Sequence, residues 1–143
     1  MNSDRKGMLS RYEDAFSDLN VGRSRGHEKP HKPIMLLAVI DLIESGRIRE
    51  NQIEFEPELL ERFKAYFDIV KSGADSLTPL LPFFHLRGDK FWHHHPRPGQ
   101  ESTYQALDNP GGKGKFLGVV DHAFLDDALF QLLRDRNARE QLR

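Results

Sequence analysis

Apolar residues recur at helical spacing in three stretches of the chain. In residues 9–19 they return every three or four positions, which predicts an amphipathic helix. Residues 33–44 are apolar on nearly every side and precede Gly46, so they predict a buried central helix that ends at this glycine. Residues 57–70 begin with a proline and place apolar side chains on one face, with Val70 expected to point inward. These stretches predict a helical core.

Other parts of the chain show strand and turn patterns. Residues 82–86 and 90–93 flank an Arg-Gly-Asp sequence, which predicts an antiparallel β-hairpin with a glycine turn. The expected fold is α+β, a mainly helical single domain over residues 1–143 with one small antiparallel hairpin or sheet. A short strand is expected from residue 52, a short helix from residue 101 and a glycine-rich loop from residue 110. A C-terminal helix is expected from residue 124, and it frays into charged residues at its end.

The composition is that of a folded domain without cysteine chemistry. The 143 residues suffice for one domain with a core, and 38% hydrophobic with 30% charged residues excludes a disordered chain. The absence of cysteine excludes disulfides, thiol catalysis and thiolate zinc sites. No apolar run is long enough to cross a bilayer, and the N-terminal residues lack a secretory pattern. We therefore expect a cytoplasmic protein without a membrane partner.

The distribution of charge says more than the formal net charge of −1. Basic residues gather in three groups, whereas acidic residues gather elsewhere in the chain. A near-neutral protein with one basic face can bind DNA. The alternative is that these are ordinary solvated charges, because charge clustering in one sequence is weak evidence. The basic groups contain Arg23, Arg25, Lys29 and Lys32; His85, Arg87, Lys90, His93, His94, His95 and Arg97; and Lys113 and Lys115.

The sequence His31-Lys32-Pro33 stands at the start of the predicted central helix. Proline fits the first turn of a helix, because its missing N–H has no helical partner there. The free N–H groups of a helix start carry partial positive charge and bind anions, and His31 and Lys32 add donors at the same end. We therefore expect a phosphate-binding site here; the alternative is that His31 caps the helix and Lys32 is solvated.

A proline-rich apolar stretch covers residues 78–86. Two prolines and several bulky apolar residues here predict a stiff, dry wall beside a basic group, and ordinary packing in the core is the alternative reading. The members of this expected wall are Pro79, Leu80, Leu81, Pro82, Phe83 and His85.

The three consecutive histidines at residues 93–95 do not predict a metal centre. Consecutive residues of a strand point to opposite faces, so the three rings are not expected to bind one ion. Together with Asn109 and His122 they follow the residue order of small HNH metal nucleases, but glycines interrupt the helix that must follow the asparagine. We expect no catalytic residue, metal or cofactor in this chain.

Two motifs together resemble one family. His31-Lys32-Pro33 with the apolar residues 34–37 resembles its helix signature, and residues 82–92, from Pro82 to Trp92, resemble its proline-aromatic motif ending in Asp and Trp. The family is that of the sulfur-binding domains that precede an HNH nuclease domain in type IV, modification-dependent restriction endonucleases. These domains recognise phosphorothioate DNA, in which sulfur replaces one non-bridging phosphate oxygen. The resemblance covers residues 23–130.

The resemblance implies roles for particular residues. His31 and Lys32 match residues that contact the modified backbone, and Pro82 matches the proline of an apolar sulfur cup, with Leu81 before it and His85 in its rim. Some members carry tyrosine where this chain has Leu81, which keeps the cup apolar but removes a hydroxyl. The remaining expected DNA contacts are Arg23, Arg25, Lys29, Arg87, Lys113 and Lys115, with Lys90 a further candidate for reading a groove.

The expected function is recognition of double-stranded phosphorothioate DNA by a non-catalytic module. The nuclease domain is absent from residues 1–143 and is expected as a partner in cis or in trans. Three alternatives remain at this point: a small metal-dependent HNH-like nuclease, a protein-interaction module that uses the apolar residues Leu80 and Leu81, and a reader of methylated or unmodified DNA.

Overall fold

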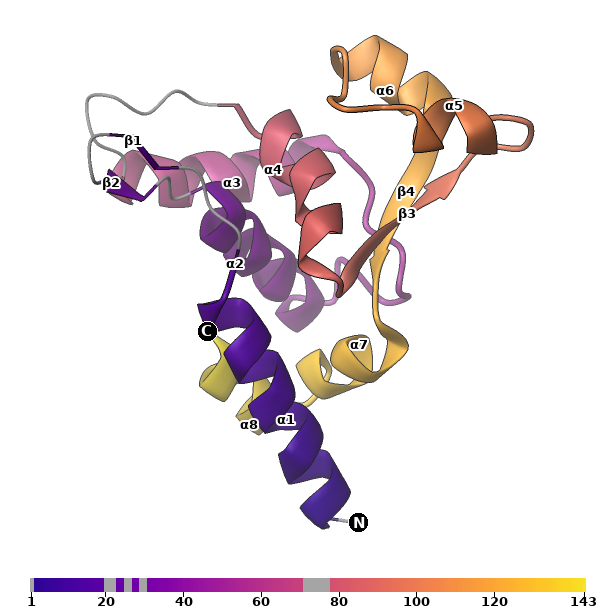
Figure 1. The fold of residues 1–143 in the computed structure, drawn as a ribbon. Helices are drawn as coiled ribbons and strands as arrows, with labels where there is room; N and C mark the ends of the chain where they lie inside the picture. Colours follow the sequence, from indigo (N-terminus) through magenta and orange to yellow (C-terminus); the bar gives the residue numbers. More distant parts are fainter. Residues whose placement is uncertain (1, 20–22, 25–26, 29–30, 71–77) are drawn as a thin grey trace.

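The structure is a computed structural model that describes residues 2–19, 23–24, 27–28, 31–70 and 78–143 (Figure 1). These residues form eight α-helices, one 3-10 helix and two antiparallel pairs of strands, which confirms a mainly helical α+β fold. The helices are α1 (Asn2–Ser17), α2 (His31–Glu44), α3 (Pro57–Val70), α4 (Leu80–His85), η1 (Leu86–Asp89), α5 (Glu101–Gln105), α6 (Lys113–Val119), α7 (Asp127–Leu133) and α8 (Arg136–Leu142). The strands are β1 (Arg23–Ser24), β2 (His27–Glu28), β3 (Trp92–Pro96) and β4 (Val120–Leu125).

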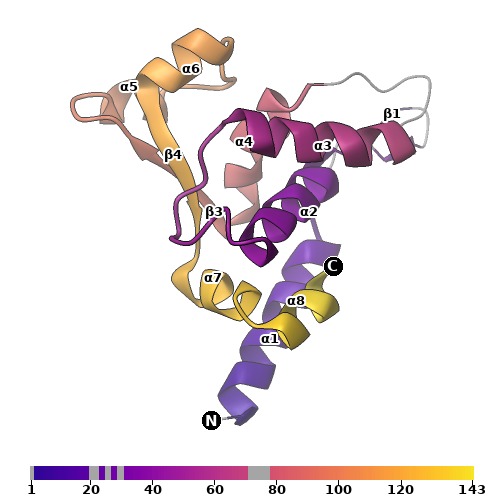
Figure 2. The ribbon, with the colours of Figure 1, turned by 180° about the vertical axis from the view of Figure 1, so that it is seen from behind.

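Helix α2 is the central element, as its apolar sequence predicts. Its residues from Ile34 to Ile43 are almost all buried, and α3 and α4 pack against it (Figures 1 and 2). The helix ends at Glu44, as predicted, and Gly46 shortly after it has a φ of +82°, a conformation that favours glycine. Helix α3 also has the predicted bounds, but Val70 at its end is 49% exposed, so the expectation that it points inward is wrong.

The predicted hairpin at residues 82–93 is wrong. Residues 80–85 form α4 and residues 86–89 form η1, while β3 pairs with the distant strand β4, in the register Trp92 to Leu125. Phe83 and Phe84 are neighbours in sequence and both are buried, which a strand with one solvent face does not allow. The left-handed residue after η1 is Lys90, with a φ of +73°, so the glycine of the expected turn is not the turning residue.

Other strands and helices differ from the expectation mainly at their ends. The strand expected at residues 52–55 is a single bridge between Ile53 and Ala123 of β4. Helix α6 begins at Lys113, inside the expected glycine-rich loop. The C-terminal helix starts at Asp127, because the residues before it belong to β4. The charged tail forms α8, which Asp135 caps by accepting a hydrogen bond from the Ala138 N–H at 3.0 Å.

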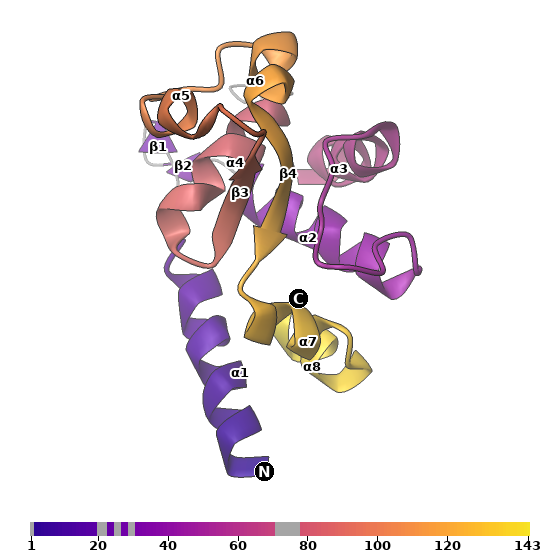
Figure 3. The same cartoon turned by 90° about the vertical axis from the view of Figure 1, so that its right-hand side faces the viewer.

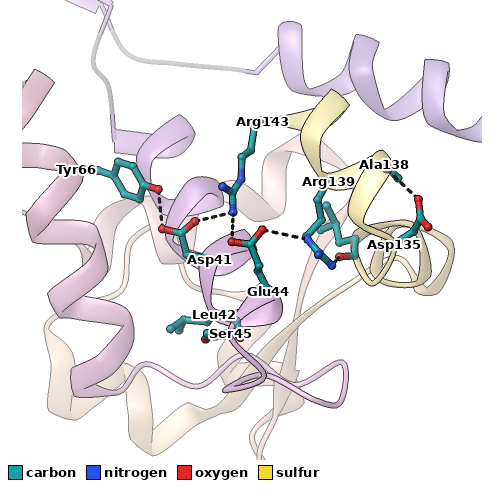
Figure 4. A network of polar contacts seen from close by, with 10 residues as sticks. Asp41, Leu42, Glu44, Ser45, Tyr66, Asp135, Ala138, Arg139 and Arg143 are labelled. Atoms are coloured by element: carbon teal, nitrogen blue, oxygen red, sulfur yellow. Dashed lines mark hydrogen bonds and ion pairs between the residues drawn. The ribbon is translucent and has the colours of Figure 1, made fainter.

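A polar network joins the C-terminal half of α2 to α3 and α8 (Figure 4). The buried Asp41 carboxylate accepts hydrogen bonds from the Tyr66 hydroxyl at 2.6 Å and from the Arg143 guanidinium at 2.8 Å. Glu44, one turn later, pairs with Arg143 at 3.4 Å and with Arg139 at 3.6 Å. These contacts fix the end of α2 opposite to His31. No helix in the described part of the chain is long and apolar enough to span a membrane.

The strands β3 and β4 separate two groups of short helices. Helices α5 and α6 form a lobe at one end of this strand pair, on the side of α4, whereas α7 and α8 lie at the other end beside α1 (Figures 1 and 3). We call residues 101–119 the α5–α6 lobe. The lobe lies beside α4, and both carry residues of the expected DNA-binding surface.

Candidate nucleic-acid interface

The cationic start of the central helix lies where the sequence predicts it. Helix α2 begins at His31, and Pro33 occupies its third position. The His31 ring is partly exposed and contacts α3, with its centroid 5.4 Å from that of Phe67 and 6.3 Å from that of Phe63. Buried residues of α2 follow directly, so the helix start is held by the core on one side and by α3 on another.

Lys32 pairs with Asp89 of η1. Its Nζ atom lies 2.6 Å from Oδ2 of Asp89, and the two side chains are only 11% and 5% exposed. Lys32 is therefore not a solvated charge, so the alternative interpretation of this residue is wrong. The pair spans 57 positions of sequence and brings the start of α2 against the segment that follows α4. The two motifs that carry the family resemblance thus lie together in space.

Helix α4 carries the residues of the expected apolar wall. Leu81 and His85 are both exposed and lie four positions apart, which places them on one face of the helix. Pro79 and Leu80 are partly exposed, and Pro82 is buried. We call Pro79, Leu80, Leu81, Pro82 and His85 the α4 wall.

Phe83 is not an accessible member of this wall. It is 1% exposed, and its ring lies 5.5 Å from that of Trp92 and 5.1 Å from that of Phe55. It supports α4 from inside the core. The helical conformation explains this difference, since Phe83 lies on the opposite side of α4 from Leu81 and His85.

His85 lies in a cationic environment. Burial is the main cause that lowers the pKa of its ring below the ordinary value of 6.5, and the charges of Lys32 and Arg87 lower it further. The side chain is nonetheless exposed and contacts the ring of Phe84 edge-on, with centroids 4.9 Å apart. A neutral imidazole thus stands at the edge of the α4 wall, with positive charge nearby.

Arg87 is engaged within the protein. Its guanidinium lies 4.1 Å from the centroid of the Phe84 ring and 5.2 Å from that of Tyr104, and it donates a hydrogen bond to the carbonyl of Leu107. The side chain is half-buried. The sequence predicts Arg87 as a DNA contact, and in the structure its guanidinium connects η1 to the α5–α6 lobe.

The remaining expected cations fall into two sets. Lys90, Lys113 and Lys115 are exposed, the last two at the start of α6. Arg23 lies in β1, but its side chain, together with Arg25 and Lys29, lies outside the described residues. Only the first set can therefore be placed relative to the α4 wall.

The three consecutive histidines have three different environments. His93 Nε2 lies 2.6 Å from Asp126, and the His95 ring stacks on that of His122 with centroids 5.0 Å apart. His94 is buried between the Tyr104 hydroxyl at 2.7 Å and the Phe83 carbonyl at 2.9 Å. Burial lowers the pKa of His94 to about 4, so its ring is neutral at physiological pH. Within the described ranges, no group of three or more His, Asp or Glu side chains is placed to hold a metal ion.

Sequence reasoning missed Asp89 and Tyr104 as partners of the site residues. Asp89 belongs to the proline-aromatic motif that resembles the family, but nothing in the sequence assigns it a partner, and Lys32 lies 57 positions away in the chain. Tyr104 lies in a short helix without a motif, and it meets both Arg87 and His94 only through the fold. No local pattern of the sequence indicates either contact.

A comparison with protein families identifies the family of this domain. The family model described as "ScoMcrA-like, DNA sulfur-binding domain" matches residues 10–141 of the 143 residues. This chain belongs to that family. The DNA sulfur-binding domain is a binding module for sulfur-modified DNA, which confirms the resemblance drawn from the His31 and Pro82 motifs. The comparison with curated proteins finds no match.

Proposed function

We propose that this domain recognises double-stranded phosphorothioate DNA with two adjoining surfaces: the α4 wall, which contacts the sulfur, and the cationic start of α2, which holds the backbone. The Lys32–Asp89 pair is the observation that carries this proposal, because it fixes the start of α2 beside the segment that ends α4. Family membership supports sulfur-modified DNA as the ligand. The geometry supports separate roles for the two surfaces, one in contact with the sulfur and the other with the backbone.

The chemistry of sulfur favours a surface of this composition. Sulfur is larger, softer and more weakly hydrated than oxygen, so an apolar contact costs it less desolvation than it costs a phosphate oxygen. Leu81 offers an exposed aliphatic surface, and His85 is a neutral ring four residues away. Discrimination between two nearly isosteric atoms is a difference of affinities, and each tenfold preference corresponds to about 1.4 kcal/mol.

Basic residues supply affinity that does not depend on the sulfur. We assign this role to His31 and Lys32 on α2, to Lys113 and Lys115 on the lobe, and to Arg23, Arg25, Lys29 and Lys90 as further backbone or groove contacts. Each phosphate contact on duplex DNA adds about 0.9 to the slope of log affinity against log salt concentration. The two surfaces are therefore separable by experiment, because salt weakens the cationic contacts far more than the apolar contact.

We also propose that the domain targets a nuclease to modified DNA. The partner is an HNH domain of a type IV restriction endonuclease, joined in cis or acting in trans, in the cytoplasm. The family's name supports this context, and the domain itself provides recognition without catalysis.

A titration with matched duplexes tests the proposal. Two duplexes of one sequence, one with a single phosphorothioate and one without, are titrated with the protein, and binding is followed by fluorescence anisotropy. We expect tighter binding of the modified duplex. Equal affinity for both would overturn the sulfur-recognition proposal, whereas cleavage of either duplex by this chain with a divalent metal would favour the nuclease alternative.

A further inference from the structure

We infer that Arg87 is a positioning residue: it holds the α5–α6 lobe against α4, and it affects DNA affinity through Lys113 and Lys115 rather than by contacting DNA itself. The inference rests on the proposed function, since it concerns how the cations of that surface are held in place. It replaces the expectation that Arg87 is one of the DNA contacts.

The contacts of Arg87 all lead into the protein. Its guanidinium lies between the rings of Phe84 on α4 and Tyr104 on α5, at 4.1 and 5.2 Å from their centroids. It also donates a hydrogen bond to the carbonyl of Leu107, which follows α5. The hydrogen bond uses one N–H group of the guanidinium, and together with the two ring contacts it fixes the position of the side chain. Arg87 therefore joins η1 and α4 to the lobe.

Tyr104 connects Arg87 to a second, buried contact of the lobe. Its hydroxyl lies 2.7 Å from Nδ1 of His94, whose Nε2 lies 2.9 Å from the carbonyl of Phe83. The lobe, strand β3 and helix α4 thus meet at His94. Because the ring of Tyr104 also faces Arg87, the two interactions support the same placement of α5.

Helix α6 rests on the same part of the core. Phe116 is fully buried, with its ring 5.7 Å from that of Phe84 and 5.4 Å from that of His94. Lys113 and Lys115 lie directly before it and are exposed. Their positions therefore depend on the placement of a helix of seven residues. A helix this short is not stable alone, so contacts outside it determine where the two ammonium groups lie.

Loss of Arg87 is thus expected to disorder the lobe and its two lysines together. In that case the DNA must pay the entropic cost of ordering the lobe, or must bind without it. If Arg87 instead contacted a phosphate, its loss would remove one ionic contact and leave the contacts of Lys113 and Lys115 intact. These two cases differ in how the effects of substitutions combine.

A double-mutant cycle distinguishes them. Affinity for the phosphorothioate duplex is measured over a salt series for wild type, Arg87→Ala, the pair Lys113→Ala with Lys115→Ala, and the triple variant. We expect Arg87→Ala to weaken binding about fivefold or more and to lower the salt slope by as much as the lysine pair does. When both lysines are already replaced, we expect Arg87→Ala to change neither the affinity nor the salt slope, so the triple variant should match the variant that lacks only the two lysines.

Three results would overturn the inference. The first is a loss of affinity from Arg87→Ala that is as large in the variant without Lys113 and Lys115 as in wild type. The second is a salt slope that Arg87→Ala lowers by a further 0.9 or so in that same variant. The third is unchanged binding on loss of Arg87 or of both lysines. Failure of the proposed function is distinguishable, because it is read from wild type alone as equal affinity for modified and unmodified duplexes.

Two further variants keep the test valid if Arg87→Ala folds poorly. Arg87→Lys keeps the charge but loses the planar guanidinium, so it should behave like Arg87→Ala if positioning is the role and like wild type if charge is the role. Tyr104→Phe keeps the ring but removes the hydroxyl bonded to His94, and it should weaken binding only when the lobe lysines are present. Faster amide hydrogen exchange confined to residues 101–119 in these variants supports the inference, and unchanged exchange there contradicts it.

Discussion

Lys32 Nζ lies 2.6 Å from Asp89 Oδ2, and this one ion pair connects the start of the central helix to η1, the segment that follows the α4 wall. Both side chains are almost completely buried. The pair is therefore one of the contacts that place the cationic and apolar surfaces relative to each other, beside the direct packing of α4 on α2. In the proposed complex, Lys32 would contact the DNA backbone while a carboxylate holds it, so its role would be inseparable from that of Asp89.

Removal of one partner of this pair should be costly for folding. Breaking a buried ion pair by removing one charge typically costs about 3–5 kcal/mol, because the other charge stays buried without compensation. We expect Asp89→Asn to lower the free energy of unfolding by about 3 kcal/mol in urea denaturation. Glu56→Gln is the control, because Glu56 pairs with Arg47 at 3.1 Å near the surface, where such pairs contribute about 0–1 kcal/mol. Equal losses in the two variants would show that the Lys32–Asp89 pair has no special weight.

The α4 wall makes a prediction about discrimination. Leu81 is 43% exposed, so its substitution should leave the core intact, whereas Pro82 is buried and its substitution risks the fold. Leu81→Asn should bring the affinity ratio between modified and unmodified duplexes close to one, because an amide surface favours the more strongly hydrated oxygen. Met8→Asn is the matched control, since Met8 is 41% exposed on α1. A ratio that survives Leu81→Asn would place the sulfur contact elsewhere.

His94 should make the stability of the domain dependent on pH. Its pKa is about 4 in the folded protein and 6.5 without burial, so the unfolded chain takes up this proton at a higher pH than the folded chain does. Acid therefore favours unfolding. The contribution is fully present above pH 6.5, declines as the pH falls and is lost near pH 4, with a total of about 3 kcal/mol. Urea denaturation across this range should show the slope in wild type and lose it in His94→Gln; an equal slope in both would assign it to other groups.

His85 predicts a pH dependence of binding with a defined sign. Burial first, and then the charges of Lys32 and Arg87, lower its pKa in the free protein, and a bound phosphate would raise it by adding negative charge. Binding then takes up a proton, so affinity for DNA should increase as the pH falls from 7 to about 5.5. His85→Gln should abolish this increase, while the control His122→Gln, which removes a histidine of β4, should retain it. Unchanged affinity of wild type over this range would remove His85 from the interface.

The helices that hold the site could be predicted from local pattern. The continuous apolar run after Pro33 gave the bounds of α2 closely, and the one-sided pattern after Pro57 gave those of α3. The hairpin prediction failed because a short apolar run with aromatic residues fits both a strand and a helix. That the neighbours Phe83 and Phe84 are both buried, which distinguishes the helix from the strand, is visible only in the structure. The sequence pattern did not predict strand β4, because the apolar residues at its end directly precede α7 and were assigned to that helix.

The candidate site was predicted in its parts but not in its connections. His31, Lys32 and the proline-rich segment were identified from motifs, and the family match supports the function inferred from them. The Lys32–Asp89 pair, the inward position of Phe83 and the engagement of Arg87 with Tyr104 are long-range contacts. They depend on how α4 and the lobe pack, which periodicity in one sequence does not encode.

The central claim, that charge holds the backbone while the α4 wall tests for sulfur, is tested most directly by the ratio of two affinities across a salt series. The same pair of duplexes, with and without one phosphorothioate, is titrated from low to high salt concentration. The account predicts that both affinities fall in parallel as salt rises, because counterion release is common to them, while their ratio stays constant and above one. A ratio of one at every salt concentration, or a preference that disappears as salt rises, would contradict it.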